Sequence, residues 1–448
     1  VSKDLRSHAA FPTATFARPS PDGVRVAFAE DYEIHVGPLL RSQAAYKRGE
    51  AMHWVGENLP QPVIKEKPDH GVTTISFGGG IHPRWIDRNR VVYASGNQVQ
   101  VYDVESGNLT TTEIRAEVAK PTPDKNSSIA FTNARIVPIT GDNVIERGTI
   151  LVEGGRIACV GTCNVDGAGR VIEADGKTII PGFVDVHGHG GFRDRDLFPQ
   201  HLSPQALFLA HGVTTILDPS VPSDQFFPVA ELVEAGRVAG PRSYATGEAL
   251  MPLSPSTGPS NNREAQALVD RLAGYGARSI KVFLTPRRDQ RQMLGEWARK
   301  HGLSATNEGA DLYYNVGSIL DGHTGFEHPM HYLTLYRDAT EFFGRAKAVY
   351  SPTLIVAGAG RWAEEYHKSR ADLWNDPVMQ RFLPWQQLAL HRETGVHPIE
   401  EYSFPFIAEG VKDIRSKGGF GAIGGHGELW GRDSHWDVWT YASAAAPI

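Results

Sequence analysis

The chain has 448 residues, of which 41% are hydrophobic and 21% charged, and its 45 basic and 51 acidic residues give a formal net charge of −6. At about 150 residues per domain, two or three globular domains are expected. The acidic balance argues against nucleic acid or an anionic membrane as the main partner. No apolar run approaches the about 18 residues that a membrane-spanning helix needs.

The first 115 residues are predicted to form β structure. The segments 21–36, "PDGVRVAFAEDYEIHV", and 86–101, "IDRNRVVYASGNQVQV", align without a gap, as in the pair Asp22 and Asp87. Each copy reads as an alternating strand, a polar turn and a second alternating strand, which is a hairpin pattern. The repeat indicates propeller blades separated by a polar insertion at about 40 to 80. Two blades cannot close a ring, so residues 1–115 are predicted to be a partial β-propeller.

A linker and a small β unit follow. Residues 115–127, "RAEVAKPTPDKNS", have two prolines and no periodicity, as in a linker. Short strands at close intervals then predict a small β-sandwich unit over 128–180. The only cysteines are Cys159 and Cys163. This spacing is weak evidence for a metal site and favours inert or locally paired thiols.

Strand and helix patterns alternate through residues 181–448. Eight strand-like runs occur, at "GFVDVH", "VTTILDP", "RSYATG", "SIKVFL", "LSATNE", "TGFEH", "VYSPTLIV" and "GFGAIGGH". Between most of them lie stretches with apolar residues at helical spacing, such as "NREAQALVDRLAGYGA". The pattern predicts an α/β fold, a TIM-type (β/α)₈ barrel, in which chemistry gathers at the carboxyl ends of the strands.

The segment 181–191, "PGFVDVHGHGG", ends the first of these strands with two histidines. In an extended chain His187 and His189 point to the same side, about 7 Å apart. The glycines beside them leave room for an ion or a ligand. Spacing alone leaves open whether the pair binds a metal or simply caps a strand.

Other ligand-type side chains also fall at or near predicted strand ends. They are Lys281 in the fourth strand, Glu308 after the fifth, His328 after the sixth and His426 after the eighth. The barrel pattern directs all of them, with the first-strand histidines, to one mouth. We therefore predict a metal site there.

These motifs, with "HGVTTILDP", "NEG" and "DGHTGFEH", resemble the metal-dependent amidohydrolase superfamily, in particular its subgroup fused to a TolB-like propeller. The resemblance covers nearly the whole chain. It implies a binuclear site, usually zinc, with His187 and His189 on one ion. It also implies that Lys281 is carboxylated by CO₂ and bridges both ions as a carbamate.

Two positions depart from the superfamily pattern, which has a histidine after the fifth strand and an aspartate after the eighth. Glu308 and His426 occupy these positions here. The expected ligand set keeps its chemistry and comprises His187, His189, Lys281, Glu308, His328 and His426. The catalytic base is then either His426 itself or, if His426 is a ligand, the nearby Glu428 or Asp433.

We expect metal-activated hydrolysis of an amide bond in a peptide, N-acyl or cyclic amide substrate. The alternatives are deamination or lactone hydrolysis at the same site, or a non-catalytic binding protein. The sequence indicates the substrate contacts less clearly. Arg287 and Arg288 begin a helix, where positive charge opposes the helix dipole, so they are expected either to bind a substrate carboxylate or to be solvated. Trp430 is expected either to line a pocket or to pack.

Residues 361–417 are predicted to contain more than one helix and to act as a lid. The chain begins without methionine and ends at Ile448 within the predicted last helix. From the first residue we expect processing or truncation upstream. From the last we expect an incomplete barrel whose exposed apolar surface associates with a second copy or with a partner chain. Likeness to propeller-fused relatives implies a periplasmic or secreted protein.

Overall fold

The structure is a computed structural model that describes residues 14–30, 32–39, 71–76, 78–117, 119, 121–122, 124, 126–190, 202–251, 258–285, 287–330, 334–357, 360–391 and 395–445. The expected insertion at about 40 to 80 lies largely outside these residues. The chain divides into two compact units. One is formed within Val1–Glu117 together with Pro259–Gly276, and the other within Val118–Gly258 and Ala277–Ile448. Among the described residues, no helix has the length and apolar character that crossing a membrane requires.

The first unit contains two antiparallel sheets of four strands each. Their strands are β1 (Thr15–Pro19), β2 (Arg25–Glu30), β3 (Glu33–Pro38) and β4 (Thr73–Thr74), then β5 (Ile81–Trp85), β6 (Arg90–Ser95), β7 (Gln98–Asp103) and β8 (Leu109–Glu113). Arg25 pairs with Pro38 across β2 and β3, and Arg90 pairs with Asp103 across β6 and β7. The two hairpins therefore share one register, which confirms the hairpin repeat predicted from the sequence.

Helix α3 (Asn262–Tyr275) belongs to this first unit. The guanidinium of Arg271 lies 4.9 Å from the ring centre of Tyr32, and the Gly96 N–H donates to the Tyr275 hydroxyl at 3.2 Å. The sequence pattern places α3 in the strand and helix alternation of the barrel. Its contacts with the N-terminal sheets could not be read from that pattern.

The small β unit has its own sheet, in the order β11-β10-β9-β12, with β13 also paired to β9. The strands are β9 (Ser128–Ile136), β10 (Ile145–Glu153), β11 (Arg156–Gly161), β12 (Arg170–Glu173) and β13 (Thr178–Ile179). Gly154 and Gly155 join β10 to β11 with φ values of 53° and 77°, which the tight hairpin turn requires. Cys159 and Cys163 form a disulfide, so the cysteines are locally paired.

All eight strands predicted after residue 181 are present and parallel. One sheet contains β14 (Phe183–Asp185), β15 (Val213–Asp218) and β16 (Arg242–Ala245), and the other β17 (Ser279–Val282), β18 (Ser304–Asn307), β19 (Gly325–Glu327), β20 (Val349–Ser351) and β21 (Phe420–Gly421). Parallel bridges from Leu250 to Val282 and from Gly188 to His426 link the two sheets at both margins. The carboxyl ends of the strands, with the residues that follow them, therefore lie on one side.

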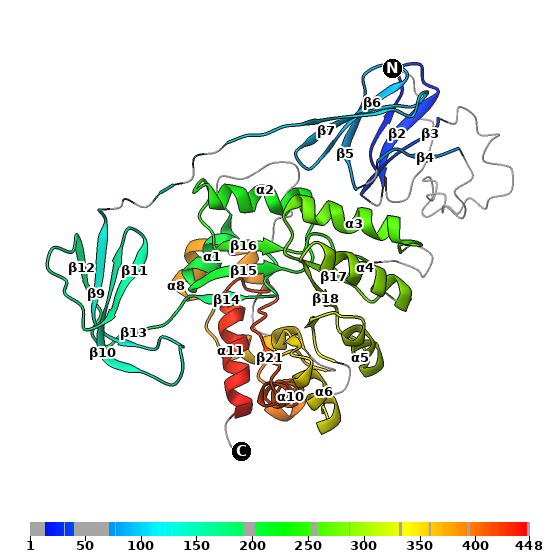
Figure 1. Ribbon diagram of the computed structural model, residues 1–448. Coiled ribbons are helices and arrows are strands. Elements are labelled where there is room, and N and C mark those ends of the chain that lie inside the picture. Colours follow the sequence, from blue (N-terminus) through cyan, green and yellow to red (C-terminus); the bar gives the residue numbers. More distant parts are fainter. Residues whose placement is uncertain are drawn as a thin grey trace. The chain divides into compact units, whose positions relative to one another are not determined.

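Helices separate most of these strands (Figure 1). They are α1 (Ser203–Ala210), α2 (Ser223–Glu234), α4 (Arg288–Lys300), α5 (Leu312–Leu320) and α6 (Arg337–Arg345). The long connection from β20 to β21 contains η2 (Leu354–Val356), α7 (Ala363–Lys368), α8 (Pro377–Phe382), α9 (Trp385–Leu390), η3 (Ile399–Glu401) and α10 (Phe404–Ser416), and α11 (Arg432–Ala445) follows β21. More than one helix over 361–417 is thus confirmed.

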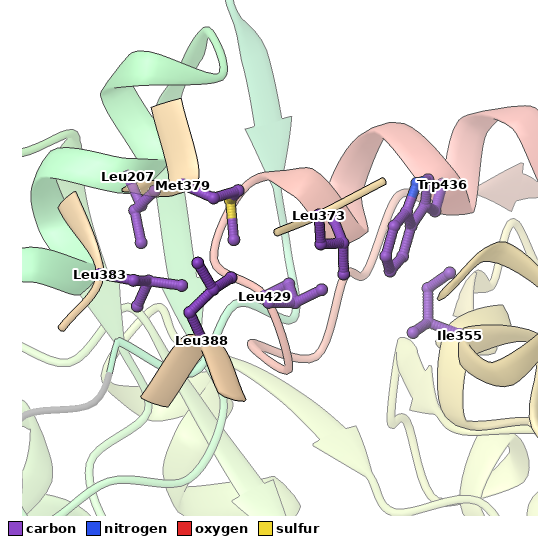
Figure 2. Close-up of a cluster of buried hydrophobic side chains, with 8 residues drawn as sticks. All are labelled: Leu207, Ile355, Leu373, Met379, Leu383, Leu388, Leu429 and Trp436. Carbon is purple, nitrogen blue, oxygen red and sulfur yellow. The ribbon is translucent and has the colours of Figure 1, made fainter. Parts of the chain in front are cut away.

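A buried apolar cluster joins this long connection to the segment after β21 (Figure 2). Its members come from α1, η2, α8, α9, α11 and the loops beside them, namely Leu207, Ile355, Leu373, Met379, Leu383, Leu388, Leu429 and Trp436. Leu429 is fully buried among them. The cluster therefore fixes the loop that carries His426 and Glu428 against the helices of the connection.

Two leucines of α9 test the contribution of this cluster. Leu388 is 4% exposed, whereas Leu390 in the same helix is 81% exposed. We expect Leu388→Ala to lower the free energy of unfolding by about 2–5 kcal/mol, because it removes buried methyl groups and leaves a cavity. Leu390→Ala, with the same change in helix propensity, should shift it by no more than about 0.5 kcal/mol. Chemical denaturation measures both, and equal effects would contradict the packing described.

Candidate metal centre

The two histidines that follow β14 are each held by a carboxylate from the end of another strand. His187 Nδ1 lies 2.7 Å from Glu327 Oε2, and His189 Nδ1 lies 2.8 Å from Asp218 Oδ1. An ionised carboxylate can only accept, so when Asp218 and Glu327 are ionised each Nδ1 donates and each Nε2 keeps its lone pair. Metal-binding histidines are commonly oriented in this way.

The other two histidines are oriented through the same ring nitrogen. The Thr353 hydroxyl donates to the Pro352 carbonyl, and His328 Nδ1 lies 2.7 Å from the Thr353 Oγ1. Because that hydroxyl proton is already engaged, His328 Nδ1 is the donor to it. His426 Nδ1 lies 3.0 Å from Glu428 Oε1. With Nδ1 as the donor, Nε2 is the acceptor nitrogen in each of the four imidazoles.

The four rings converge. The His187 ring centre lies 5.1 Å from that of His189 and 4.6 Å from that of His328. The His426 ring centre is 5.2 Å from His187 and 5.0 Å from His189. Potential ligand atoms of His187, His189 and His426 lie within 4.8 Å of one another. His187 Nε2 is buried and has no hydrogen-bond partner among the described residues.

Lys281 and Glu308 form an adjacent pair. Lys281, in β17, is 2% exposed, and its Nζ lies 2.5 Å from Glu308 Oε2. The other carboxylate oxygen, Glu308 Oε1, lies 3.4 Å from His328 Nε2. The structure thus brings together all six side chains that the sequence predicts as ligands, in two neighbouring groups: His187, His189 and His426, and Lys281, Glu308 and His328.

Burial governs the protonation of these groups. It lowers the pKa of His328 to about 2, with the Lys281 charge adding to the effect, and it lowers the pKa of His187 as well. Burial raises the pKa of Glu327 to about 7, against the opposing effects of Lys281 and a hydrogen bond from Thr306. His187 and His328 are therefore neutral at neutral pH, which is the form that binds metal.

Backbone strain collects at the same strand ends. Leu284, His328, Thr353 and His426, which follow β17, β19, β20 and β21, have φ values of 41°, 63°, 45° and 67°. Residues other than glycine rarely adopt this region, and such residues concentrate at functional sites. The rings of two of these residues, His328 and His426, pack against that of His187.

A buried aspartate ties the first strand to the last. Asp185, at the end of β14, accepts from the His187 N–H at 3.0 Å through Oδ1. Its Oδ2 accepts from the Gly425 N–H at 3.1 Å and from the Ser434 hydroxyl at 2.5 Å. One carboxylate therefore links β14, the loop after β21 and the start of α11.

A second buried aspartate shapes the loop that carries His426. Asp433 Oδ2 accepts from the N–H groups of Gly427 and Leu429, each at 3.0 Å. Its Oδ1 accepts from the N–H groups of Gly431 at 2.9 Å and Ser434 at 2.8 Å. Asp433 was one of the candidates for the base, but both of its oxygens are engaged by backbone donors, so its role in the fold is to hold the loop.

The carboxylates that orient the first-strand histidines are not among the residues predicted from the sequence. Asp218 ends β15 in "ILDP", and Glu327 ends β19 in "GFEH". Both carboxylates lie at the end of a predicted strand, which is the same feature that identified the metal-binding candidates. Which histidine each would contact could not be inferred, because that depends on side-chain conformation across strands far apart in the chain.

The side chains predicted to bind substrate have partners in the protein. Arg287 pairs with Asp289, and Arg288 pairs with Asp321 at 2.8 Å. The Trp430 indole N–H donates to the His189 carbonyl at 3.0 Å. Trp430 thus supports the chain segment of the first-strand histidines, and the substrate-binding roles of the three residues stay predictions.

Comparison with known proteins confirms the expected resemblance to the amidohydrolase superfamily, although no family model matches. The chain is 30% identical over 134 residues to an adenine deaminase of Deinococcus radiodurans, covering 29% of this chain and 24% of that protein. It is 51% identical over 66 residues to an N-substituted formamide deformylase of Arthrobacter pascens, covering 14% and 12%. It is 24% identical over 214 residues to a 5'-deoxyadenosine deaminase of Methanosarcina mazei, covering 42% and 49%. The chain thus spans less than half the length of each of these relatives.

Solved structures agree at the level of the fold. A Xaa-Pro dipeptidase with bound methionine in the active site matches with a TM-score of 0.54 and 16% identity, over 72% of this chain and 85% of that chain. An amidohydrolase matches with a TM-score of 0.50 and 17% identity, over 71% and 83%. The mixed α/β fold is therefore one that amidohydrolases have.

The role of Asp433 in holding the loop can be tested with an isosteric change. In Asp433→Asn an amide N–H₂ would face backbone N–H donors, so at least one buried donor loses its acceptor. We expect the free energy of unfolding to fall by about 1–3 kcal/mol. Asp413→Asn, on the exposed side of α10, is the matched control and should change it little. Chemical denaturation measures both variants. An equal change in the free energy of unfolding for Asp433→Asn and Asp413→Asn would contradict the assigned role of Asp433.

Proposed function

We propose that the protein is a metal-dependent hydrolase that cleaves an amide C–N bond. The observation that supports this most strongly is the set of four imidazoles whose Nδ1 atoms each lie against an oxygen and whose rings converge. Possible ligand atoms of His187, His189 and His426 lie within 4.8 Å of one another. A buried Nε2 on His187 without a partner among the described residues fits a metal ligand, since buried polar atoms are otherwise hydrogen-bonded.

We further propose two metal ions, with zinc as the preferred metal. His187, His189 and His426 would hold one ion, and Glu308 and His328 the other. Lys281, whose Nζ lies 2.5 Å from Glu308 Oε2, would help to hold both ions once CO₂ had converted its ammonium to an anionic carbamate. Imidazole nitrogens and carboxylate oxygens are the donors that zinc takes in hydrolases. Asp218 and Glu327 would add the negative charge that two dications require.

Bound zinc supplies an activated water and polarises the scissile carbonyl. The chain's own contribution is orientation and proton transfer. His426 keeps its proton at Nδ1, where Glu428 Oε1 accepts it. With His426 counted as a ligand, Glu428 is the proposed base: its side chain is 34% exposed, and its Oε2 can take a proton and return it to the departing nitrogen. His187, Lys281 and Glu327 form the water-excluded side of the site.

Substrate recognition is proposed at the start of α4. Arg287 and Arg288 would bind a substrate carboxylate if it took the places of Asp289 and Asp321. A small amide or a peptide is the proposed substrate class. Deamination is the second candidate, and the similarity to an adenine deaminase and a 5'-deoxyadenosine deaminase favours it. Release of ammonia instead of a larger amine distinguishes the two reactions.

The finer architecture is also a proposal. We infer a closed (β/α)₈ barrel from the eight parallel strands and from the bridges at both sheet margins. The N-terminal hairpin repeat supports two blades of a TolB-like propeller over residues 1–115, and residues 128–180 are the proposed sandwich unit. The barrel would then occupy 181–448, with the segment 361–417 as the proposed lid.

A periplasmic or secreted location is proposed on the basis of the disulfide between Cys159 and Cys163, because disulfides persist mainly in oxidising compartments. Association with a second copy or with a partner chain is proposed as well. Large apolar side chains such as Leu390 and Trp385 are exposed, and surface of this kind often marks an interface.

Metal removal tests the proposed function directly. Hydrolysis of a panel of N-acyl amino acids, dipeptides and cyclic amides should require bound metal, disappear on chelation and return with Zn²⁺. Lys281→Ala should lower turnover by at least about 100-fold, because it removes a proposed ligand, and loss of a group that only orients a ligand already costs about 10- to 100-fold. Lys300→Ala, on the exposed face of α4, is the control. Undiminished turnover in Lys281→Ala would contradict the proposal.

The disulfide can be tested separately. Protein purified without reductant and unfolded in denaturant should bind no maleimide, and after reduction it should bind two per chain, one at each cysteine. Intact-mass spectrometry measures the label. Two maleimides bound before reduction would show free thiols and would remove the support for an oxidising compartment.

A further inference from the structure

One of the carboxylates that orient the imidazoles depends on a second side chain for its own position. Glu327, at the end of β19, has its Oε2 atom 2.7 Å from His187 Nδ1. Its other oxygen, Oε1, accepts from the Thr306 hydroxyl at 2.7 Å. Thr306 and Glu327 are each only 5% exposed, so water competes little for this hydrogen bond. Both oxygens of the carboxylate therefore have a fixed partner.

The carboxylate that orients the second histidine of the first strand is held differently. Asp218 Oδ2 accepts from the Gly190 N–H at 3.0 Å, and a change of side chain does not remove such a backbone donor. Glu327 has no backbone donor of this kind among the described residues, where its side chain hydrogen-bonds to Thr306 and His187. The support of the Glu327 carboxylate thus rests on one hydroxyl group, which a single substitution can remove.

The pairing of three strands brings the Thr306 hydroxyl to this place. In the parallel register, Thr306 of β18 pairs with Lys281 of β17 on one side and with Gly325 of β19 on the other. Glu327 lies two residues beyond Gly325, on the same face of that strand. A Cβ atom at position 325 would lie 2.5 Å from Thr306 Oγ1. The glycine therefore leaves open the space from which the hydroxyl reaches Glu327.

We propose that Thr306 is a positioning residue for the metal centre: its hydroxyl holds the Glu327 carboxylate so that Oε2 meets His187 Nδ1. The consequence lies at the other ring nitrogen, His187 Nε2, which is buried and has no hydrogen-bond partner among the described residues. A fixed acceptor at Nδ1 sets the tautomer and the ring plane of His187 and makes its Nε2 a better ligand. The inference rests on the proposed function, because it takes His187 as a metal ligand.

Zinc affinity of the purified full chain tests this role without relying on turnover. Competition with a chelating dye should show that Thr306→Val, which keeps the shape but lacks the hydroxyl, binds Zn²⁺ about tenfold more weakly than the unchanged protein, at the low end of what loss of such supporting groups costs. Thr306→Ser keeps the hydroxyl and should bind Zn²⁺ as the unchanged protein does. The control is Thr340→Val in α6. Thr340 is also fully buried, but its hydroxyl donates to the Arg337 carbonyl, so Zn²⁺ affinity should not change.

A second background separates positioning from general destabilisation. In Glu327→Ala the carboxylate that Thr306 holds is gone, so adding Thr306→Val should weaken Zn²⁺ binding no further. Circular dichroism checks that each variant is folded, and Thr306→Ala replaces Thr306→Val if the valine variant is not.

Three outcomes would overturn the inference alone. They are Zn²⁺ binding by Thr306→Val as tight as that of the unchanged protein, an equally weak Thr306→Ser, and an effect of Thr306→Val that persists in the Glu327→Ala background. If the unchanged protein itself binds no Zn²⁺, the proposed function is overturned and this inference with it.

Discussion

The site depends on one constraint: each of four imidazoles has its Nδ1 bound to an oxygen of the protein. Asp218, Glu327, Thr353 and Glu428 supply those oxygens from four different positions along the chain. Because a neutral imidazole has one donor and one acceptor nitrogen, binding Nδ1 as the donor leaves Nε2 as the acceptor. The four rings lie against one another. Without these contacts each ring could rotate, and its lone pair would have no fixed direction.

The rest of the second unit serves this constraint by fixing the strand ends. Asp185 joins the first strand to the loop after the last, and Asp433 engages four backbone N–H groups of that loop and the start of α11. His328 and His426 adopt positive φ, which is unfavourable for a histidine. The buried hydrogen bonds and the cluster around Leu429 offset that strain.

Much of the fold could be predicted because it follows from local periodicity. The eight strands, the N-terminal hairpin repeat and the helices after β20 all produce apolar patterns with a period of two or near 3.6. The observed strands are shorter than the runs that predicted them, so His328 and His426 fall in loops beyond the strands, where the strain arises. Strand position was therefore enough to find the six proposed ligands but not to describe how they are held.

The contacts between distant residues could not be predicted from one sequence. The pairing of His187 with Glu327 spans 140 residues, and nothing local in "GFEH" indicates which ring it would meet. The same holds for α3, which contacts the N-terminal sheets, and for Arg288, which Asp321 engages. A charged residue at a helix start can bind substrate or pair within the protein, and only its three-dimensional neighbours distinguish the two.

The most direct test of the account is anomalous diffraction at the zinc edge from crystals of the protein grown with Zn²⁺. The account predicts a strong peak bonded to the Nε2 atoms of His187, His189 and His426, with each Nδ1 still on its oxygen partner. A peak bound through Nδ1, or zinc bound elsewhere while these three rings turn apart, would contradict it.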